Sequence, residues 1–496
     1  MIVVIMTMKR ALILTSLIVA VTFTVNVASA QEVHPILFFN SINETPGWKY
    51  RDEEPYKSWN GRIPWLLSRY SMDYDFSDPS KKENNKARKC YQFALAYLIT
   101  GNTSFAEKAV EGLRYIGEGK YGYSYSSYGG WALSDYAIAY DWMYNYIQEN
   151  YPEIDSEIRD KLAKWADILY TNYSQSGDVG VRIIRACALG LVATVLENYT
   201  SPYSSGKEEW LNAATTWLFE EDYTGRSALN RYHNYGGLIR GIEGYYGRWA
   251  RSLILWLHVY DKNYGNPFMK WKLARDIYNI FIATNLPDGK RPNNGAQGNI
   301  IEDQLWNYYV IDIHPNAEWQ RWLVEYLGED YFIPDEWDGY LFYDKHAASP
   351  IKPNFTTFIS AESESAIFRK DWSIESDYLW FRFFNITTPP GRDRWHNDNF
   401  AFEYYSRGDL LLLDCGEIKH YILDPDRLGK GGYGAMDSKG HNVLMINNGY
   451  GKVGGPTKGG NANPPPFGEI DNPTALKDYL VSEFFEFAEA EMNWKI

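Results

Sequence analysis

The stretch DRWHNDNFAFEYYSRGDLLLLDCGE, residues 393–417, predicts two antiparallel β-strands joined by a tight turn. Aromatic and aliphatic residues dominate both halves, and the Ser-Arg-Gly sequence at 406–408 is typical of a chain reversal. Because residues i and i+2 of a strand lie on the same face, His396 and Asp398 share one face. The turn returns the second strand alongside the first, which carries Asp414 toward His396.

The same period-two pattern continues on both sides of this hairpin, from about residue 350 onward. It recurs in TTFISAES, SAIFRKDW, YLWFRFFNIT and HNVLMIN. We therefore predict an antiparallel sheet domain over residues 351–496. The final residues, FFEFAEAEMNWKI, contain neither a turn nor a polar tail. A sheet ending there would expose an edge strand, so we expect a fragment of a longer chain or a covered edge.

Residues 86 to 330 show helical periodicity instead. The predicted helices are 87–100, 104–117, 131–149, 153–172, 180–199, 207–219, 242–262, 268–286, 303–313 and 316–328. The segment VRIIRACALGLVATVLENY (181–199) is apolar on more than one face, so it must pack between other helices. Short connections imply antiparallel hairpins arranged as a bundle, a solenoid or a closed toroid. The absence of a fixed sequence repeat disfavours a regular solenoid.

The N-terminus has the composition of an export signal. From Met8 it reads MKRALILTSLIVAVTFTVNVASA, with a basic start, an apolar run and the small-residue pattern Ala28-Ser29-Ala30. We predict a signal peptide over residues 1–30 and a secreted or cell-envelope protein. The alternative is an uncleaved membrane anchor, because the apolar run is nearly long enough to span a bilayer.

Charge and cysteine content exclude several classes of protein. Without the signal, 47 basic groups face 63 acidic groups, a net charge of about −16 that disfavours nucleic acid as a partner. A local basic cleft can still bind an anionic substrate. Aromatics make up 17% of the chain, and Trp and Tyr rings stack on sugars, although most must lie in the core. The three cysteines, Cys90, Cys187 and Cys415, form no CxxC pair and are expected to be small buried hydrophobes.

Three polar residues of the sheet region could hold a metal ion. His441 opens a later strand in SKGHNVLMIN (438–447), so it can join His396 and Asp414 on neighbouring strands. Imidazole and carboxylate groups are zinc ligands. The alternative is that these are ordinary hydrogen-bonded polar groups of a sheet.

Two helical-region stretches are also rich in polar residues. ALNRYHNYGGLIRGIEGYYGRWARS (228–252) holds His233 and Asn234 between glycines. Four arginines accompany them: Arg231, Arg240, Arg248 and Arg251. Such groups at one end of a toroid would line its cavity, or they belong to a solvated interhelical loop. The stretch 285–309 is long, polar and glycine-rich, and is therefore a candidate binding loop.

The segments FRKDW (368–372), 396–417 and SKGHNVLMIN, in this order and spacing, resemble the heparinase II/III-like polysaccharide lyases. YAIAYDWMY (136–144) and LPDG (286–289) are similar to that family as well. The resemblance implies an α+β multidomain fold. An N-terminal α/α toroid, an incomplete barrel of helical hairpins, would occupy residues 31–350. An antiparallel β-sandwich, truncated if the chain is a fragment, would follow over 351–496, with the active site between the two.

The resemblance also implies a zinc ion, chiefly structural, bound by His396, Asp414 and His441. The implied substrate is an anionic polysaccharide or oligosaccharide containing uronic acid, cleaved by β-elimination. In the family, an Asn or His of the helical domain neutralises the uronate carboxylate, while Tyr and His serve as base and acid. His233 and Asn234 match the Asn/His position in residue type.

Two positions depart from the family pattern. Arg394 stands where the family commonly has a histidine, and an arginine can bind a carboxylate but cannot serve as a base. No tyrosine closely follows the LPDG turn; Tyr308 is the nearest later candidate, and Tyr235 is its rival. We therefore predict a secreted polysaccharide lyase. The alternatives are a catalytically inactive carbohydrate-binding or cell-envelope protein on the same fold and, more remotely, a glycoside hydrolase, which would need paired carboxyl groups.

Overall fold

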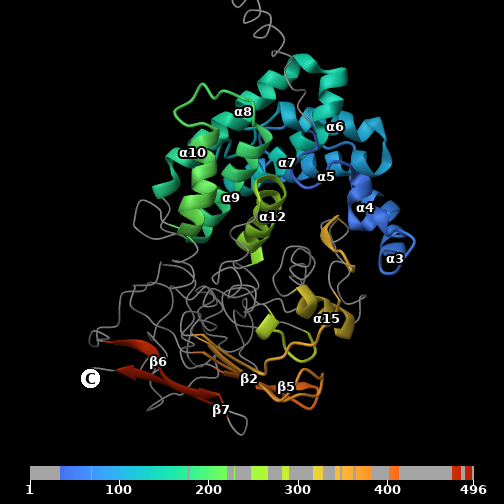
Figure 1. Ribbon diagram of the computed structural model, residues 1–496. Coiled ribbons are helices and arrows are strands. Elements are labelled where there is room, and N and C mark those ends of the chain that lie inside the picture. The colour runs from blue at the N-terminus through green and yellow to red at the C-terminus, as the bar shows by residue number, and fades with distance from the viewer. Residues whose placement is uncertain are drawn as a thin grey trace, which may run out of the picture.

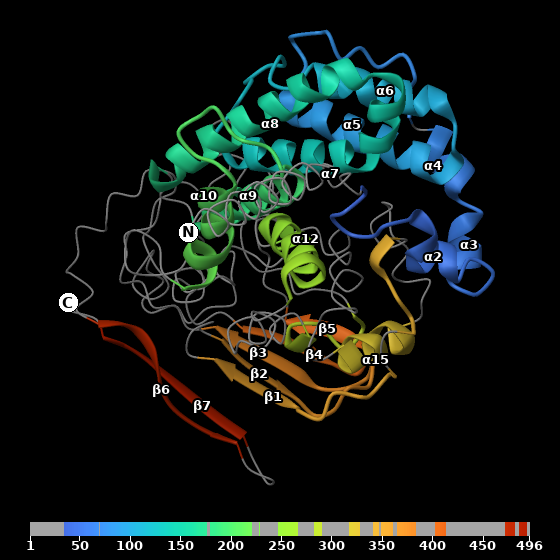
Figure 2. The same ribbon diagram turned by 45° about the horizontal axis from the view of Figure 1, so that its top comes forward.

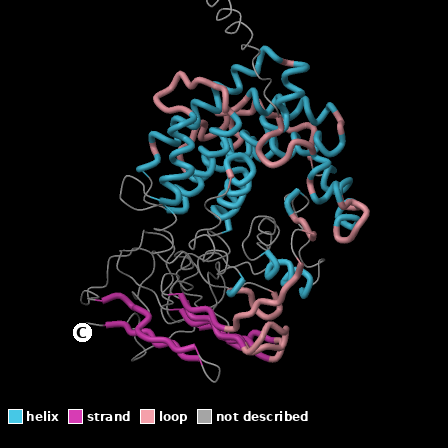
Figure 3. The backbone as a smooth tube through the Cα atoms, viewed as in Figure 1, coloured by secondary structure: helices cyan, strands magenta, loops and turns pink. Residues whose placement is uncertain are grey.

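The fold is built from helices in the first part of the chain and antiparallel strands in the second, as the computed structural model in Figure 1 shows. The structure describes residues 34–68, 70–175, 179–220, 228, 247–265, 282–289, 317–327, 341–346, 349–360, 365–382, 402–412, 472–481 and 486–493. Figure 3 shows the helices and the strands gathered in different parts of the molecule.

The helical part begins with four short helices that the sequence pattern did not predict. They are η1 (Ile42–Glu44), α2 (Pro46–Lys49), α3 (Tyr56–Asn60) and α4 (Ile63–Ser68). The longer helices follow the predicted periodicity closely. They are α5 (Glu83–Thr100), α6 (Thr103–Arg114), α7 (Ser127–Asn150), α8 (Pro152–Thr171), α9 (Val179–Val195), α10 (Lys207–Asn212), the π-helical η3 (Ala213–Glu220), α12 (Gly247–Tyr264) and α15 (Ala317–Leu327). A further short 3-10 helix, η2, spans Tyr173–Gln175.

Local sequence explains where these helices begin and end. Helix α5 stops at Gly101, whose φ of 65° is a left-handed conformation that glycine adopts without strain. The next helix starts at once, because the Asn102 side chain accepts a hydrogen bond from the Ser104 N–H. Pro152 occupies the first turn of α8, where a missing N–H does not weaken the helix.

The helices pack as antiparallel hairpins in two curved layers (Figure 2). Helices α5, α7 and α9 are neighbours in the inner layer, with α12 against α9, and α6, α8 and α10 lie outside them. The prediction that 181–199 is buried between helices is confirmed, because α9 is almost wholly enclosed. At Gly190 a side chain would collide with the Trp256 ring, so glycine lets α9 approach α12 closely. Cys90 and Cys187 are buried free thiols, as expected.

The segment that precedes η1 is tied to α7 by one buried carboxylate. Asp141 accepts hydrogen bonds from the main-chain N–H groups of Ile36 and Leu37, and its Oδ1 lies 2.7 Å from Nδ1 of His34. The His34 ring also packs on Tyr144, with 4.0 Å between ring centroids. Asp141, which belongs to the stretch YAIAYDWMY, therefore has a structural role.

The strands form a five-stranded antiparallel sheet in sequence order, β1-β2-β3-β4-β5. The strands are β1 (Thr357–Ser360), β2 (Ser365–Arg369), β3 (Tyr378–Arg382), β4 (Phe402–Ser406) and β5 (Asp409–Leu412). The predicted hairpin is confirmed: Ser406 pairs with Asp409 across a two-residue turn. Arg407 and Gly408 have φ values of 54° and 83°, the positive values of a type I′ turn.

A second, two-stranded sheet contains β6 (Asn472–Val481) and β7 (Glu486–Asn493). These strands pair antiparallel along nearly their whole length. The pattern analysis predicted apolar strand character at 484–496, but it did not predict the partner strand β6. One edge of β7 is therefore hydrogen-bonded to β6 of the same chain.

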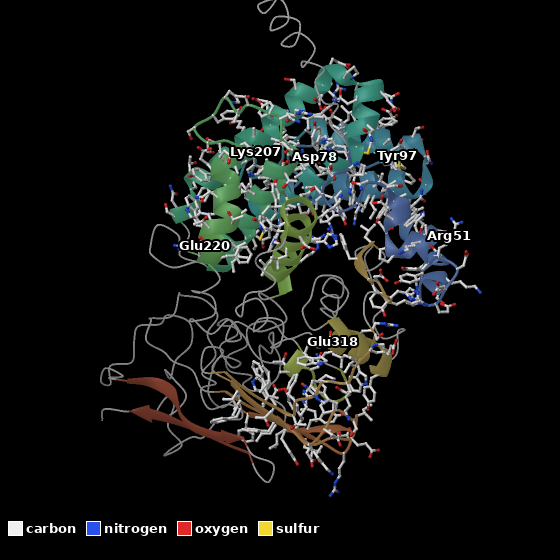
Figure 4. The ribbon with its side chains drawn as sticks, in the orientation of Figure 1. Arg51, Asp78, Tyr97, Lys207, Glu220 and Glu318 are labelled. Atoms are coloured by element: carbon white, nitrogen blue, oxygen red, sulfur yellow. The ribbon has the colours of Figure 1, made fainter. Side chains whose placement is uncertain are left out.

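Hydrogen bonds connect the helices to the residues that lead into the sheet, 341–351. Figure 4 labels Glu318 on α15, and its main-chain oxygen accepts a 3.0 Å hydrogen bond from the Ile351 N–H. The Tyr56 hydroxyl donates to the main-chain oxygen of Tyr343 at 2.7 Å. No helix within the described residues is long and apolar enough to cross a membrane. Residues 1–33, with the predicted signal, lie outside that part of the chain.

Candidate functional site

Two arginines from different helices face one carboxylate inside the helical layers. Nη1 of Arg88 on α5 and Nη1 of Arg251 on α12 each lie 3.7 Å from Oδ1 of Asp135 on α7. We call Arg88, Arg251 and Asp135 the arginine pair site. Helices α7 and α12 both pack against α9, and the Arg251 side chain reaches from α12 to Asp135 on α7.

The Tyr91 ring lies next to both arginines of the arginine pair site. The guanidinium of Arg88 lies 4.9 Å from the centre of the Tyr91 ring, and that of Arg251 lies 6.0 Å from it. Tyr91 is buried, so its ring is a fixed surface rather than a mobile side chain. Both guanidiniums lie within the distance at which cation–π attraction to this ring is favourable.

The site brings two guanidiniums to one carboxylate in a chain that is acidic overall. Each arginine side chain is about a quarter exposed, at 24% for Arg88 and 25% for Arg251, whereas Asp135 is 8% exposed. The planar fork of a guanidinium binds carboxylate and sulfate groups with two parallel hydrogen bonds. Both guanidiniums are thus partly open to solvent and have the chemistry to bind an anionic group.

Arg251 was among the arginines that the sequence placed beside a possible cavity. Of the four arginines of 228–252, it is the one whose side chain lies in the described part of the chain. Its side chain reaches between helices, while residues 229–246 of the stretch lie outside the described part, so their role stays a prediction. Arg88 and Asp135 were not predicted, because each lies within an ordinary helical pattern and no sequence signal shows that they meet.

The residues predicted to carry the chemistry all fall outside the described residues. These are His233, Asn234, Tyr308 and Arg394 for catalysis, and His396, Asp414 and His441 for zinc. Their roles and contacts stay predictions. Among the residues that the structure does describe, no group of three His, Cys, Asp or Glu side chains is placed to hold a metal ion.

The family-like segments that are described have structural functions. The LPDG stretch forms a turn, closed by a 2.8 Å hydrogen bond from the Gly289 N–H to the Leu286 carbonyl oxygen. The arginine of FRKDW, Arg369, is buried and donates to main-chain oxygens of Ala283 and Asn285, just before this turn. These contacts join the segment 283–289 to strand β2.

The combination of paired helices followed by an antiparallel sheet defines a fold found in polysaccharide lyases. Solved structures of heparinase III share it. One, with methylated lysines, matches with a TM-score of 0.51 and 13% identity, over 78% of this chain and 58% of that one. A second has a TM-score of 0.50 and 14% identity over 81% and 63%. A third has a TM-score of 0.50 and 15% identity over 78% and 58%.

The chain therefore has the heparinase III fold, as its sequence motifs predicted. It spans about three fifths of the length of those lyases, with 58% to 63% of each covered. No protein-family model matches the chain, and no curated protein matches it by sequence.

Proposed function

We propose that this protein is an exported lyase that cleaves a uronic-acid-containing polysaccharide by β-elimination. The heparinase III fold is the observation that carries the proposal. The arginine pair site supports it independently, because a uronate presents a carboxylate that a guanidinium such as Arg88 or Arg251 can bind. Both arginines lie in the helical part, which contributes substrate-binding groups in the proposed site.

The proposed reaction needs three groups around one sugar. A cationic or hydrogen-bonding group neutralises the uronate carboxylate, so that the proton on C5 becomes acidic. A base removes that proton, and its electron pair forms the C4–C5 double bond as the C4–O4 bond breaks. An acid then protonates the departing O4. The products are a chain ending in a 4,5-unsaturated uronate and a chain ending in a free hydroxyl.

In this proposal His233 and Asn234 neutralise the carboxylate, and Tyr308 transfers the proton. Arg394 anchors a substrate carboxylate, since its guanidinium stays charged and cannot act as a base. The arginine pair site holds a carboxylate or sulfate of the bound chain. It supplies charge and geometry rather than proton transfer.

We also propose that His396, Asp414 and His441 hold a structural zinc ion. The β4–β5 hairpin supports this, because it reverses the chain between the segments that carry His396 and Asp414. Two imidazoles and a carboxylate suit zinc, which would clamp neighbouring strands when bound. The proposed elimination uses no step on the metal.

The proposal is tested by ultraviolet absorbance of the unsaturated uronate. Purified protein would be incubated with alginate, heparan sulfate, hyaluronan and glucuronan, each alongside a His233→Ala variant. Absorbance that rises with wild type and not with the variant supports the lyase. Tight binding of an oligouronate without turnover, unchanged by His233→Ala, instead identifies an inactive carbohydrate-binding protein on the same fold.

A further inference from the structure

Three tyrosines in the segment 121–128 project into solvent. Tyr121, Tyr125 and Tyr128 are 66%, 50% and 53% exposed, more than any other aromatic side chain in the described ranges. Single exposed apolar residues are common on protein surfaces. The occurrence of single exposed residues does not explain three exposed aromatic rings within eight residues. We call Tyr121, Tyr125 and Tyr128 the tyrosine platform.

The segment alternates between outward and inward tyrosines. Tyr123 lies between the exposed Tyr121 and Tyr125, yet its ring packs inside, 5.5 Å from Trp165 in an edge-to-face arrangement. Its hydroxyl donates to the main-chain oxygen of Ile116. The indole N–H of Trp165 in turn donates to the Ser124 carbonyl oxygen at 3.0 Å. The segment is therefore anchored from within, while its outer tyrosines keep their exposure.

A buried carboxylate fixes the start of the same segment. Glu83 accepts hydrogen bonds from the N–H groups of Gly117 and Gly119, and from the hydroxyl of Tyr136. The backbone of Lys120 is also held, since its N–H donates to Lys81 and its carbonyl oxygen accepts from Glu83. These contacts fix the chain on both sides of Gly119.

Tyr121 itself has a backbone φ of 78°, a left-handed conformation that costs energy for a residue with a side chain. Such a conformation persists only where the surroundings impose it, and it is found most often at functional sites. The fixed contacts of Gly117–Lys120 impose it here. Their result is a tyrosine that points away from the protein.

A buried positive charge lies beside the Tyr125 ring, and no carboxylate of the described residues forms an ion pair with it. Arg185 on α9 is 2% exposed, and its guanidinium lies 5.5 Å from the centre of the Tyr125 ring. It donates to main-chain oxygens of Asn172 and Tyr173. Within the described ranges its Nε has no hydrogen-bond partner. The Lys120 ammonium likewise lies 5.3 Å from the Tyr121 ring centre. Both cations favour an anionic ligand over a neutral one.

Tyr128, the platform residue that belongs to α7, lies on the same side of that helix as Asp135 of the arginine pair site. Tyr128 and Asp135 are seven residues apart, two helical turns, so they share one face about 10 Å apart along the axis. Trp131 lies between them on that face, with its ring 5.5 Å from that of Tyr128. Tyr128, Trp131 and Asp135 therefore follow one another along one face of α7.

We propose that Tyr121, Tyr125 and Tyr128 form a binding subsite for acidic polysaccharide, holding sugar units that flank the unit bound by Arg88 and Arg251. Aromatic rings stack on the apolar faces of pyranoses, while the cations beneath attract their carboxylates or sulfates. The identity of the polymer as a uronate-containing chain rests on the proposed function. The subsite would give the protein a preference for long chains over short ones.

The test compares binding of long and short ligands. Wild type, a Tyr121→Ala/Tyr125→Ala double variant and a Tyr121→Trp/Tyr125→Trp double variant would be titrated calorimetrically with glucuronan, alginate, heparan sulfate and their disaccharides. Leu411→Ala is the control, because Leu411 is 56% exposed on β5, away from α7. We expect the alanine variant to lose roughly tenfold in affinity for long chains and little for disaccharides. The tryptophan variant should bind long chains at least as well as wild type.

Unchanged affinity of the alanine variant for long chains would overturn the subsite, as would an equal loss in Leu411→Ala or no binding of any polymer by wild type. Carboxyl-reduced glucuronan should bind more weakly than the acidic polymer; equal binding would remove the ionic part of the proposal. Turnover, followed by unsaturated-uronate absorbance, separates the two proposals. Wild-type binding without turnover rejects the lyase and leaves the subsite, whereas turnover with unchanged KM in the alanine variant rejects the subsite alone.

Discussion

Arg369 of strand β2 donates a 2.7 Å hydrogen bond to the main-chain oxygen of Asn285, so one buried guanidinium links the sheet to the segment that begins the LPDG turn. The same group donates to Ala283 and lies 3.7 Å from the centre of the Trp372 indole. Burial lowers the pKa of Arg369 to about 10, which still leaves it charged at neutral pH. The link therefore persists under physiological conditions.

Replacing Arg369 should destabilise the protein strongly. Arg369→Met would leave two buried carbonyl oxygens without their donor and remove the cation from Trp372. We expect a loss of about 3 kcal/mol in the free energy of unfolding. Lys370→Met is the matched control, because the neighbouring Lys370 side chain is exposed and should change stability by less than about 0.5 kcal/mol. Urea denaturation followed by tryptophan fluorescence measures both; equal midpoints would contradict the structural role of Arg369.

Removing either guanidinium of the arginine pair site should weaken substrate binding. Arg88→Met and Arg251→Met each delete one of two charged donors, and a charged hydrogen bond contributes about 1.5–3 kcal/mol. We therefore expect KM to rise roughly tenfold or more, with a smaller change in kcat, since neither arginine transfers a proton. Arg114→Met, on the exposed face of α6, is the control. A loss of kcat at unchanged KM would mean that these arginines act in the chemical step.

The order of helices and strands could be predicted from the sequence because it follows from local periodicity. Helices α5 to α9 and strands β1 to β5 each coincide with a predicted apolar pattern. The four short helices before residue 69 were missed, since a helix of one turn has no periodicity to detect. Strand β6 was missed as well, because its Asn-Pro start and mixed polarity weaken the strand signal.

The candidate site could be predicted only where function leaves a local signature. His233 and Asn234 lie between glycines, a local pattern that is visible in the sequence, and they were predicted on that basis. The arginine pair site combines side chains from three helices: Arg88, Asp135 and Arg251. The periodicity of one helix does not show which residues of other helices it contacts. The tyrosine platform could not be predicted either. In the sequence its tyrosines look like core residues, and only the structure shows that Tyr123 packs inside while its neighbours are exposed.

Zinc content can be measured without any substrate. We expect about one zinc per chain in purified wild type, and loss of that metal in a His396→Ala/His441→Ala double variant, because two of its three proposed protein ligands are gone. Chelation should also lower the melting temperature of wild type, since a bound metal stabilises the folded state. A His346→Ala variant serves as control, because this exposed histidine pairs with Glu53 instead. Zinc that stays bound in the double variant would remove the assignment.

Acid should destabilise the protein through His258. Its ring packs beside Phe38 and Phe342, with centroids 5.9 Å and 5.4 Å away. Burial lowers the pKa of His258 to about 4 from 6.5; the charge of Lys262 lowers it further, while a hydrogen bond to the Phe38 main chain opposes the shift. Between pH 6.5 and 4 the unfolded chain therefore binds a proton that the folded chain does not, so stability falls as the pH falls.

The free energy of unfolding should fall by no more than about 3 kcal/mol on acidification through this range. The effect is smaller to the extent that His258, which is partly exposed, keeps contact with water. His258→Gln keeps a hydrogen-bond donor but cannot be protonated in this range. Urea denaturation at pH 7, 6, 5 and 4.5 should therefore give a shallower decline in the variant than in wild type. Parallel declines would show that other groups control the acid sensitivity and that His258 is protonated equally in the folded and unfolded chains.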